Sequence, residues 1–252
     1  MTKNLKQFIN GIDYLISKSF FYLQSRFTSI LKDFIYSIFF TKCIKSNFKI
    51  IMDAACFAEM EIDKLRNVKY IDRGNSSNAS KYSSAAEIEY IPDIIKSIIA
   101  KHRDLLGSYL GDDFLFEKPL LFRNYSIPEE MHTYDIYSNI WHQDSHDGYK
   151  LLKIFVLIHD VTIDDGPFIF LNSINSRKHW NALCNRWDFG KITKLPRFEE
   201  EVQLCGKTGD YLIINTATDM HRASIPKKYR DILQISLYPS WRKNNYRYVY
   251  ND

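Results

Sequence analysis

The sequence predicts an α+β protein in which a double-stranded β-helix, or jelly roll, forms the core and helices N-terminal to it provide support. Apolar residues in the first part of the chain recur every three or four residues, which is the helical period. From Pro119 onward, short runs rich in β-branched and aromatic residues alternate with turn formers. The chain has 252 residues and no internal repeat, so we expect one domain. Its parts would be a mainly helical region (1–114), a jelly-roll core (115–242) and a C-terminal tail (243–252).

The first helix is expected between Phe8 and Phe40, where apolar residues line one face. Charged residues such as Lys18 and Lys32 interrupt it before the roughly 20 apolar residues that a membrane span requires. Two roles stay open for this helix. It could pack on the sheet or on a second copy of the chain in a homo-oligomer, or it could make a peripheral membrane contact through residues 8–50.

A second helical stretch is expected from Pro92 to Leu106. Proline suits the first turn of a helix, and Asp93 places a negative charge near the positive end of the helix dipole. The turn formers further along the chain separate seven expected strands. These are Leu120–Tyr125, Asp135–Trp141, Leu151–Val161, Phe168–Leu171, Val202–Leu204, Tyr211–Asn215 and Ile232–Tyr238.

Charge and cysteine content exclude several classes of protein. The net charge is +4, and the basic excess lies in the N-terminal region without forming a basic stripe or a nucleic-acid-reading motif. We therefore expect no nucleic-acid partner. The 4 cysteines are scattered, with no Cys-x-x-Cys pair, which argues against a zinc ribbon or a disulfide scaffold and favours a cytoplasmic location.

Two separated fragments contain the residues with the most specific chemistry. The first is Trp141-His142-Gln143-Asp144, and the second contains His221. Residues two apart on a strand point to the same side, so His142 and Asp144 could both face the interior from one strand end. Two histidines and one carboxylate hold Fe(II) on one face and leave the opposite positions open for a co-substrate and O₂.

Arg230 follows His221 at the start of an apolar strand. If this strand and the strand Tyr211–Asn215 were antiparallel neighbours, the guanidinium would lie near the metal. Its planar fork could then bind a carboxylate of the co-substrate, and that pairing would compensate an otherwise costly buried charge.

Over residues 115–242 the chain resembles the phytanoyl-CoA dioxygenase family of Fe(II)/2-oxoglutarate-dependent oxygenases. The resemblance rests on fragments that occur in the family's order. They are Trp141-His142-Gln143-Asp144, the run Leu152 to Val161, Asp165-Gly166-Pro167-Phe168, Gly209-Asp210-Tyr211-Leu212-Ile213, and His221-Arg222 leading to Arg230. The chain departs from the family at Leu171-Asn172-Ser173-Ile174, where relatives usually have Pro-Gly-Ser-His.

The resemblance implies roles for individual residues. His142, Asp144 and His221 would be catalytic iron ligands, and Arg230 would bind the 2-oxoglutarate carboxylate. Gln143 would contact the site from outside the ligand set, and Ser224 would assist 2-oxoglutarate, with Ala223 as a nearby alternative. The implied activity is hydroxylation of an unactivated C–H bond of a small molecule, lipid-like or carrier-linked, with O₂ consumed and succinate and CO₂ as co-products.

Other readings of the sequence stay open. The same iron site could catalyse desaturation or cyclisation, and a jelly roll could keep the metal site as a non-catalytic binding or scaffold protein. The long segment from Ser173 to Glu201 is rich in Arg, Lys and Trp. It could form a lid over the site or a solvated excursion.

Overall fold

The structure is a computed structural model, and it describes residues 48–72, 81–132, 134, 136–144, 150–179, 197–239 and 248–249. The predicted helix from Phe8 to Phe40 and the membrane contact proposed for residues 8–50 fall almost entirely outside these residues. Within the described part of the chain, every helix is too short or too polar to cross a membrane.

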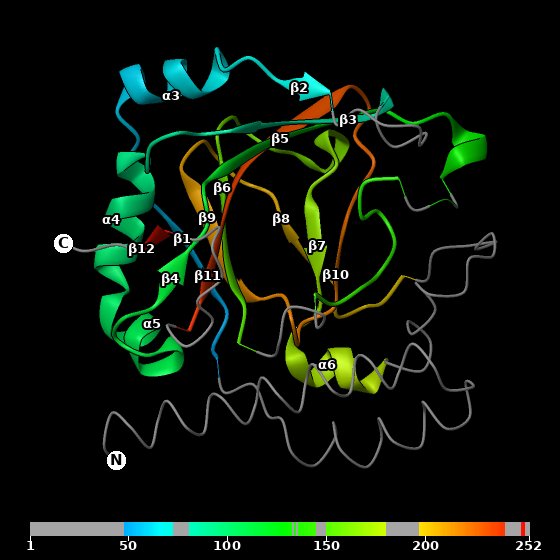
Figure 1. Cartoon of the computed structure of the whole chain (residues 1–252). Helices are drawn as coiled ribbons and strands as arrows, with labels where there is room; N and C mark the ends of the chain where they lie inside the picture. Colours follow the sequence, from blue (N-terminus) through cyan, green and yellow to red (C-terminus); the bar gives the residue numbers. More distant parts are fainter. Residues whose placement is uncertain are drawn as a thin grey trace.

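Two antiparallel sheets form the core of the described structure, which confirms the predicted jelly roll with helices (Figure 1). The larger sheet has the strand order β1-β9-β6-β11-β5-β3-β2, with β4 and β12 attached beside β11. The smaller sheet has the order β10-β7-β8.

The strands of the larger sheet are β1 (Ile51–Ala54), β2 (Ile71–Asp72), β3 (Ser83–Glu87), β4 (Leu115–Phe116), β5 (Leu120–Tyr125), β6 (Leu152–Leu157), β9 (Asp210–Asn215), β11 (Tyr229–Tyr238) and β12 (Tyr248–Val249). Those of the smaller sheet are β7 (Phe168–Phe170), β8 (Val202–Leu204) and β10 (His221–Ala223). The α-helices are α3 (Glu59–Arg66), α4 (Asp93–Lys101), α5 (Arg103–Leu110) and α6 (Ser173–Lys178), and the 3₁₀ turns are η2 (Glu129–Met131) and η4 (Ile163–Asp165).

The larger sheet separates two apolar cores. Helices α4 and α5 lie against its outer face, and the smaller sheet lies on the opposite side (Figure 1). On β6, Ile154 and Val156 pack with the helices, whereas Phe155 and Leu157 pack with the smaller sheet. This alternation follows from the two-residue period of a strand. Along each central strand, every second side chain therefore faces the space between the sheets.

The structure corrects several details of the sequence prediction. The segment Asp135–Trp141 was expected to be a strand, but its described residues are bends and irregular backbone. The pairing considered between the strand Tyr211–Asn215 and the strand of Arg230 does not occur, because β6 lies between β9 and β11. The single helix expected from Pro92 to Leu106 is two consecutive helices, α4 and α5.

Three strands come from the region that was predicted to be mainly helical. Strand β1 pairs with β9, and β3 pairs with both β5 and β2, so the N-terminal region extends the larger sheet at both of its ends. Strand β3 reads Ser-Ser-Ala-Ala-Glu, which lacks the β-branched and aromatic residues typical of strands. Pairing with its neighbours, rather than local propensity, accounts for this element.

Candidate metal centre and cavity

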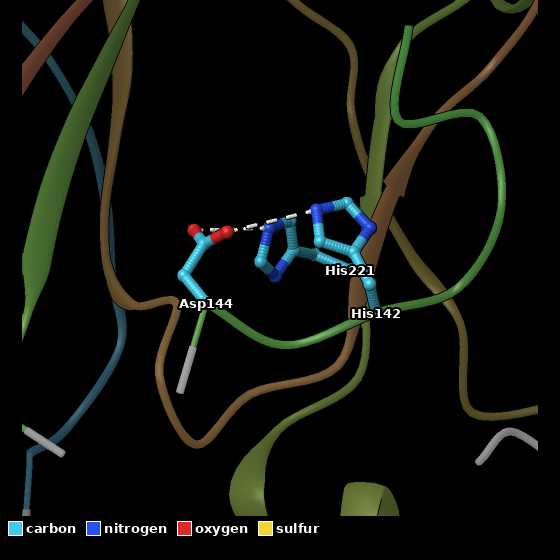
Figure 2. A group of neighbouring side chains, drawn as sticks. All are labelled: His142, Asp144 and His221. Carbon is cyan, nitrogen blue, oxygen red and sulfur yellow. Dashed lines mark ion pairs between the residues drawn. The ribbon is translucent and has the colours of Figure 1, made fainter. Parts of the chain in front are cut away.

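His142, Asp144 and His221 meet between the two sheets, at positions fixed by backbone hydrogen bonds (Figure 2). The backbone N–H of His142 donates to the carbonyl of His221, and the N–H of His221 donates to the carbonyl of His142, both at 3.0 Å. The backbone N–H of Asp144 donates to the carbonyl of Thr216 at 2.8 Å. His142 therefore lies in a short β-bridge and Asp144 in the loop after it. The sequence had predicted that both would lie at the end of a regular strand.

Both imidazoles are oriented by backbone carbonyl groups. Nδ1 of His142 lies 2.8 Å from the carbonyl oxygen of Ile140, and Nδ1 of His221 lies 2.9 Å from that of Asp219. A carbonyl oxygen only accepts hydrogen bonds, so each Nδ1 carries the proton and each Nε2 presents a lone pair. This arrangement is typical of metal-binding histidines.

The lone pairs converge on the carboxylate. Nε2 of His142 lies 3.8 Å from Oδ1 of Asp144, and Nε2 of His221 lies 3.5 Å from Oδ2. One ligand atom of each residue lies within 4.8 Å of the others, and all three side chains are buried. Figure 2 shows both rings pointing towards the carboxylate. Two imidazole nitrogens and one carboxylate oxygen are the donor set of non-heme Fe(II) oxygenases.

Asp144 is held in its charged form. Burial acts to raise its pKa, but the ammonium of Lys153 outweighs burial and holds the pKa of this carboxyl well below its ordinary value. Nζ of Lys153 lies 2.8 Å from Oδ2 of Asp144. The carboxylate is thus available as a metal ligand throughout the neutral pH range.

A cavity of about 570 Å³ connects this triad with Arg230. Its walls include the inward residues of β11, beginning with Arg230 and ending with Tyr238, and the aromatic rings of Phe155 and Phe168. The ring of Phe168 stacks on His221 with a centroid distance of 5.4 Å. An apolar surface therefore extends from the triad into the cavity that Arg230 also lines.

Arg230 is a buried cation for which the described residues provide no carboxylate partner within ion-pair distance. One terminal nitrogen donates to the carbonyl of Gly166, whereas Nε is buried without a hydrogen-bond partner. Burial lowers the pKa of the guanidinium to about 10, although Tyr137 and Asp231 act in the opposite direction. Such a group is ready to bind an anion that enters the cavity.

Gly166 explains how the turn before β7 reaches Arg230. Its φ of +69° lies in the left-handed region, and a Cβ atom would lie 2.5 Å from the backbone nitrogen of Pro226. Before it, η4 begins with a capping box between Thr162 and Asp165. The Asp-Asp-Gly-Pro fragment therefore forms a tight turn whose carbonyl contacts the guanidinium, and only glycine fits at its end.

The three residues predicted to bind the cofactor, Arg230, Gln143 and Ser224, have different surroundings in the structure. Arg230 lines the same cavity as the triad. The side-chain amide of Gln143 donates to the carbonyl of Thr218, so it stabilises the loop between β9 and β10. Ala223 lines the cavity, and the buried Oγ of Ser224 has no hydrogen-bond partner among the described residues. The role of Ser224 in binding 2-oxoglutarate stays a prediction.

The sequence analysis did not predict that two residues, Lys153 and Tyr137, belong to the site. Lys153 is a charged residue inside the otherwise apolar run Leu151 to Ile158, and this interruption could have identified it. Tyr137 also lines the cavity, and burial raises the pKa of its hydroxyl, which donates to the carbonyl of Tyr125 at 3.2 Å. It lies in the segment that was mistaken for a strand, so no pattern predicted its orientation.

Comparison with known proteins finds similar folds at low sequence identity. HygX from Streptomyces hygroscopicus, solved with nickel and 2-oxoglutarate, is 12% identical over 85% of this chain and 88% of its own, with a TM-score of 0.45. EctD from S. alaskensis, solved with 2-oxoglutarate and 5-hydroxyectoine, is 15% identical over 75% of this chain and 72% of its own, with a TM-score of 0.48.

SnoN from nogalamycin biosynthesis, described as a non-heme alpha ketoglutarate dependent epimerase, is 14% identical over 76% of this chain and 78% of its own, with a TM-score of 0.45. No protein-family model and no curated protein matches the chain. At this level of similarity, the functional conclusion has to come from the residues of the site itself.

Proposed function

We propose that this protein is an Fe(II)/2-oxoglutarate-dependent oxygenase that hydroxylates a small molecule. The observation behind the proposal is the combination, in one cavity, of the His142–Asp144–His221 group with the buried guanidinium of Arg230. Each half alone has an ordinary structural explanation. Together they match the two ends of a 2-oxo diacid, which chelates a metal at one end and has a free carboxylate at the other.

The residues fit the metal on chemical grounds. The two Nε2 lone pairs and the Asp144 carboxylate would supply three ligands from one side of a bound Fe(II) and would leave its other positions open for exogenous ligands. Bound iron would supply the activation of O₂ and the oxidation of the substrate, coupled to conversion of 2-oxoglutarate to succinate and CO₂.

The chain itself contributes binding, orientation and exclusion of water. Arg230 would hold the far carboxylate of 2-oxoglutarate through charge-assisted hydrogen bonds. The rings of Phe155 and Phe168, which lie 4.4 Å apart by centroid, would cover its methylene groups and keep water from the reacting centre. The carbonyls of Ile140 and Asp219 would keep both histidines in the metal-binding tautomer.

Hydroxylation is the outcome that the resemblance to the phytanoyl-CoA dioxygenase family supports, because the ligand set retains its carboxylate at Asp144. The substrate would share this cavity with 2-oxoglutarate. The inward residues of β11 that line the cavity include Gln234 and Ser236, so a molecule with polar groups near the reacting C–H bond fits better than a bare hydrocarbon chain.

The first test is anaerobic titration of the purified protein with Fe(II) and 2-oxoglutarate. The expected result is the weak visible charge-transfer band of the iron chelate in the wild-type protein and its absence in His142→Ala. The variant should remain folded, since it truncates a ring that the structure places beside a cavity, and thermal unfolding provides that control.

Two outcomes would contradict the proposal in different ways. A folded, iron-loaded wild-type protein without the band would rule out 2-oxoglutarate as co-substrate. A protein that shows the band but forms no succinate with O₂ under any substrate screened would favour the non-catalytic binding protein. Product analysis by mass spectrometry would separate hydroxylation, a gain of one oxygen atom, from desaturation or cyclisation, a loss of two hydrogen atoms.

A further inference from the structure

Lys153 is the described cation nearest to the candidate metal ligands, and its position is rigid. It lies in β6, which is hydrogen-bonded on both sides, with Lys153 opposite Ile214 of β9 and Ser236 of β11. Its side chain points between the sheets and lines the cavity, and only 18% of it is exposed. A residue held by two ladders in the middle of a sheet presents its side chain more accurately than a loop residue can.

The two oxygens of Asp144 have different surroundings. Oδ1 faces Nε2 of His142 at 3.8 Å. Oδ2 lies 3.5 Å from Nε2 of His221 and 2.8 Å from the ammonium of Lys153. The ammonium forms an ion pair with Oδ2, so it attracts that oxygen more strongly than Oδ1. The two oxygens are therefore not equivalent when a metal ion arrives.

We propose that Lys153 is a positioning residue that keeps Asp144 a metal ligand through one oxygen by holding the other. This inference rests on the proposed function. Three protein ligand atoms would leave the other coordination positions of a bound metal ion open for a chelating 2-oxo acid and O₂. A carboxylate that bound through both oxygens would occupy one of these positions, and Lys153 prevents that by engaging the second oxygen.

Groups that contact a metal-ligating carboxylate from outside orient it, and their loss typically lowers metal affinity or activity about 10- to 100-fold. In Lys153→Met, the second oxygen of Asp144 has no ammonium to hold it and can bind the metal. The variant should therefore bind a metal ion but bind 2-oxoglutarate at least about tenfold more weakly than the wild type.

Anaerobic Co(II) substitution provides a readout that is independent of turnover. A carboxylate that binds Co(II) through both oxygens instead of one changes the ligand set and the geometry of the ion, and therefore its visible d–d absorption. We expect the absorption spectrum of Lys153→Met to differ from that of the wild type, and a larger concentration of 2-oxoglutarate for the half-maximal spectral change. Lys153→Arg, which keeps a cationic donor, should return both quantities towards the wild-type values.

Lys207→Met is the matched control, because Lys207 also forms a Lys–Asp pair, with Asp160 at 2.7 Å, but on the exposed surface. It should leave the Co(II) spectrum and the 2-oxoglutarate titration unchanged. If Lys153→Met does not fold, Lys153→Gln removes the charge with a polar side chain and serves the same comparison.

The inference is overturned if a folded variant without the ammonium has the same Co(II) spectrum and the same 2-oxoglutarate affinity as the wild type. Failure of the proposed function looks different. In that case the wild-type Co(II) protein itself would not respond to 2-oxoglutarate, while the comparison of Co(II) spectra between the wild type and the Lys153 variants would still decide whether Lys153 controls the coordination of Asp144.

Discussion

The two faces of strand β11 carry opposite charges at successive positions, and only one of these charges has an oppositely charged partner among the described residues. Asp231 points outward and receives two hydrogen bonds of 2.6 Å from Arg123, its register partner on β5. Arg230 points inward to the cavity, and its Nε has no hydrogen-bond partner. Both residues are buried.

The difference shows which charge serves the fold and which serves a ligand. The Arg123 guanidinium lies between the rings of Tyr70 and Tyr229, at 4.4 and 4.6 Å from their centroids, so the outer pair is enclosed on both sides. The Arg123–Asp231 pair fixes the register of β5 and β11 next to Arg230, which is the first of the β11 residues that line the cavity. The outer charges stabilise the strand, and the inner charge is left for an anion.

Replacing Arg230 should give the largest effect, and on binding rather than on stability. Arg230→Met removes the partner of the 2-oxoglutarate carboxylate, which should weaken 2-oxoglutarate binding by about 100-fold or more, equivalent to about 3 kcal/mol. The melting temperature should stay equal or rise, because a buried cation without a carboxylate partner is removed. Calorimetric titration of the Fe(II) protein and thermal unfolding measure the two quantities.

Arg230→Lys is the matched variant for this test. It keeps the charge but loses the planar fork, so an intermediate affinity is expected. A variant Arg230→Met that binds 2-oxoglutarate as tightly as the wild type would show that the guanidinium has another role.

Replacing Asp231 should lower the stability of the fold and leave 2-oxoglutarate binding almost unchanged, the reverse of what is expected for Arg230. Asp231→Asn leaves Arg123 without its charged partner and should lower the free energy of unfolding by about 2–3 kcal/mol, less than for a fully enclosed pair because Arg123 is partly exposed. The folded fraction should bind 2-oxoglutarate with nearly unchanged affinity. Denaturant unfolding and titration below the melting temperature check both statements, and a stable variant with weakened binding would reverse the assignment of the two faces.

The same contrast explains what the sequence could predict. The alternation of apolar residues in β6, β9 and β11 is a local pattern, so the central strands and the jelly roll were predictable. That Arg230 and the His142–Asp144–His221 group would lie near one another was predictable from the family resemblance, which has those residue types in that order, whereas their roles stay predictions. Strand β3 and the irregular backbone at 136–141 were not, because pairing and cavity contacts determine them.

The contacts within the site also lay beyond the sequence. Nothing in the spacing of Lys153 and Asp144 places an ammonium 2.8 Å from the carboxylate, since the segments that carry them meet only through the packing of β6 beside the loop that follows His142. Likewise, the sequence left open whether the strand of Arg230 lies beside β9, and in the structure β6 lies between them. A non-local sheet order depends on the whole chain, and local periodicity does not encode it.

Breaking the exposed pair of Asp53 and Lys101 should have the smallest effect on stability. It is therefore the reference with which the loss of the buried Asp231–Arg123 pair is compared. Hydrogen bonds from Lys101 and from the backbone N–H of Ala54 lower the pKa of Asp53 from 3.8 to about 2. A carboxyl whose pKa is lower in the folded than in the unfolded state stabilises the fold above its unfolded pKa, and this contribution disappears as the pH falls through the folded value. The difference in melting temperature between wild type and Asp53→Asn should therefore be present at pH 5 and shrink as the pH falls from about 4 towards 2.

That difference should remain small throughout, and 1 M NaCl should reduce it further, because solvent and salt screen an exposed pair. Asp231→Asn should keep most of its penalty in the same salt, since Asp231 is enclosed by Arg123 and the sheet. Thermal unfolding of the two variants across pH and salt tests both expectations together. Equal penalties in high salt would mean that burial does not distinguish the two pairs, and the structural role assigned to the outer face of β11 would then lose its physical basis.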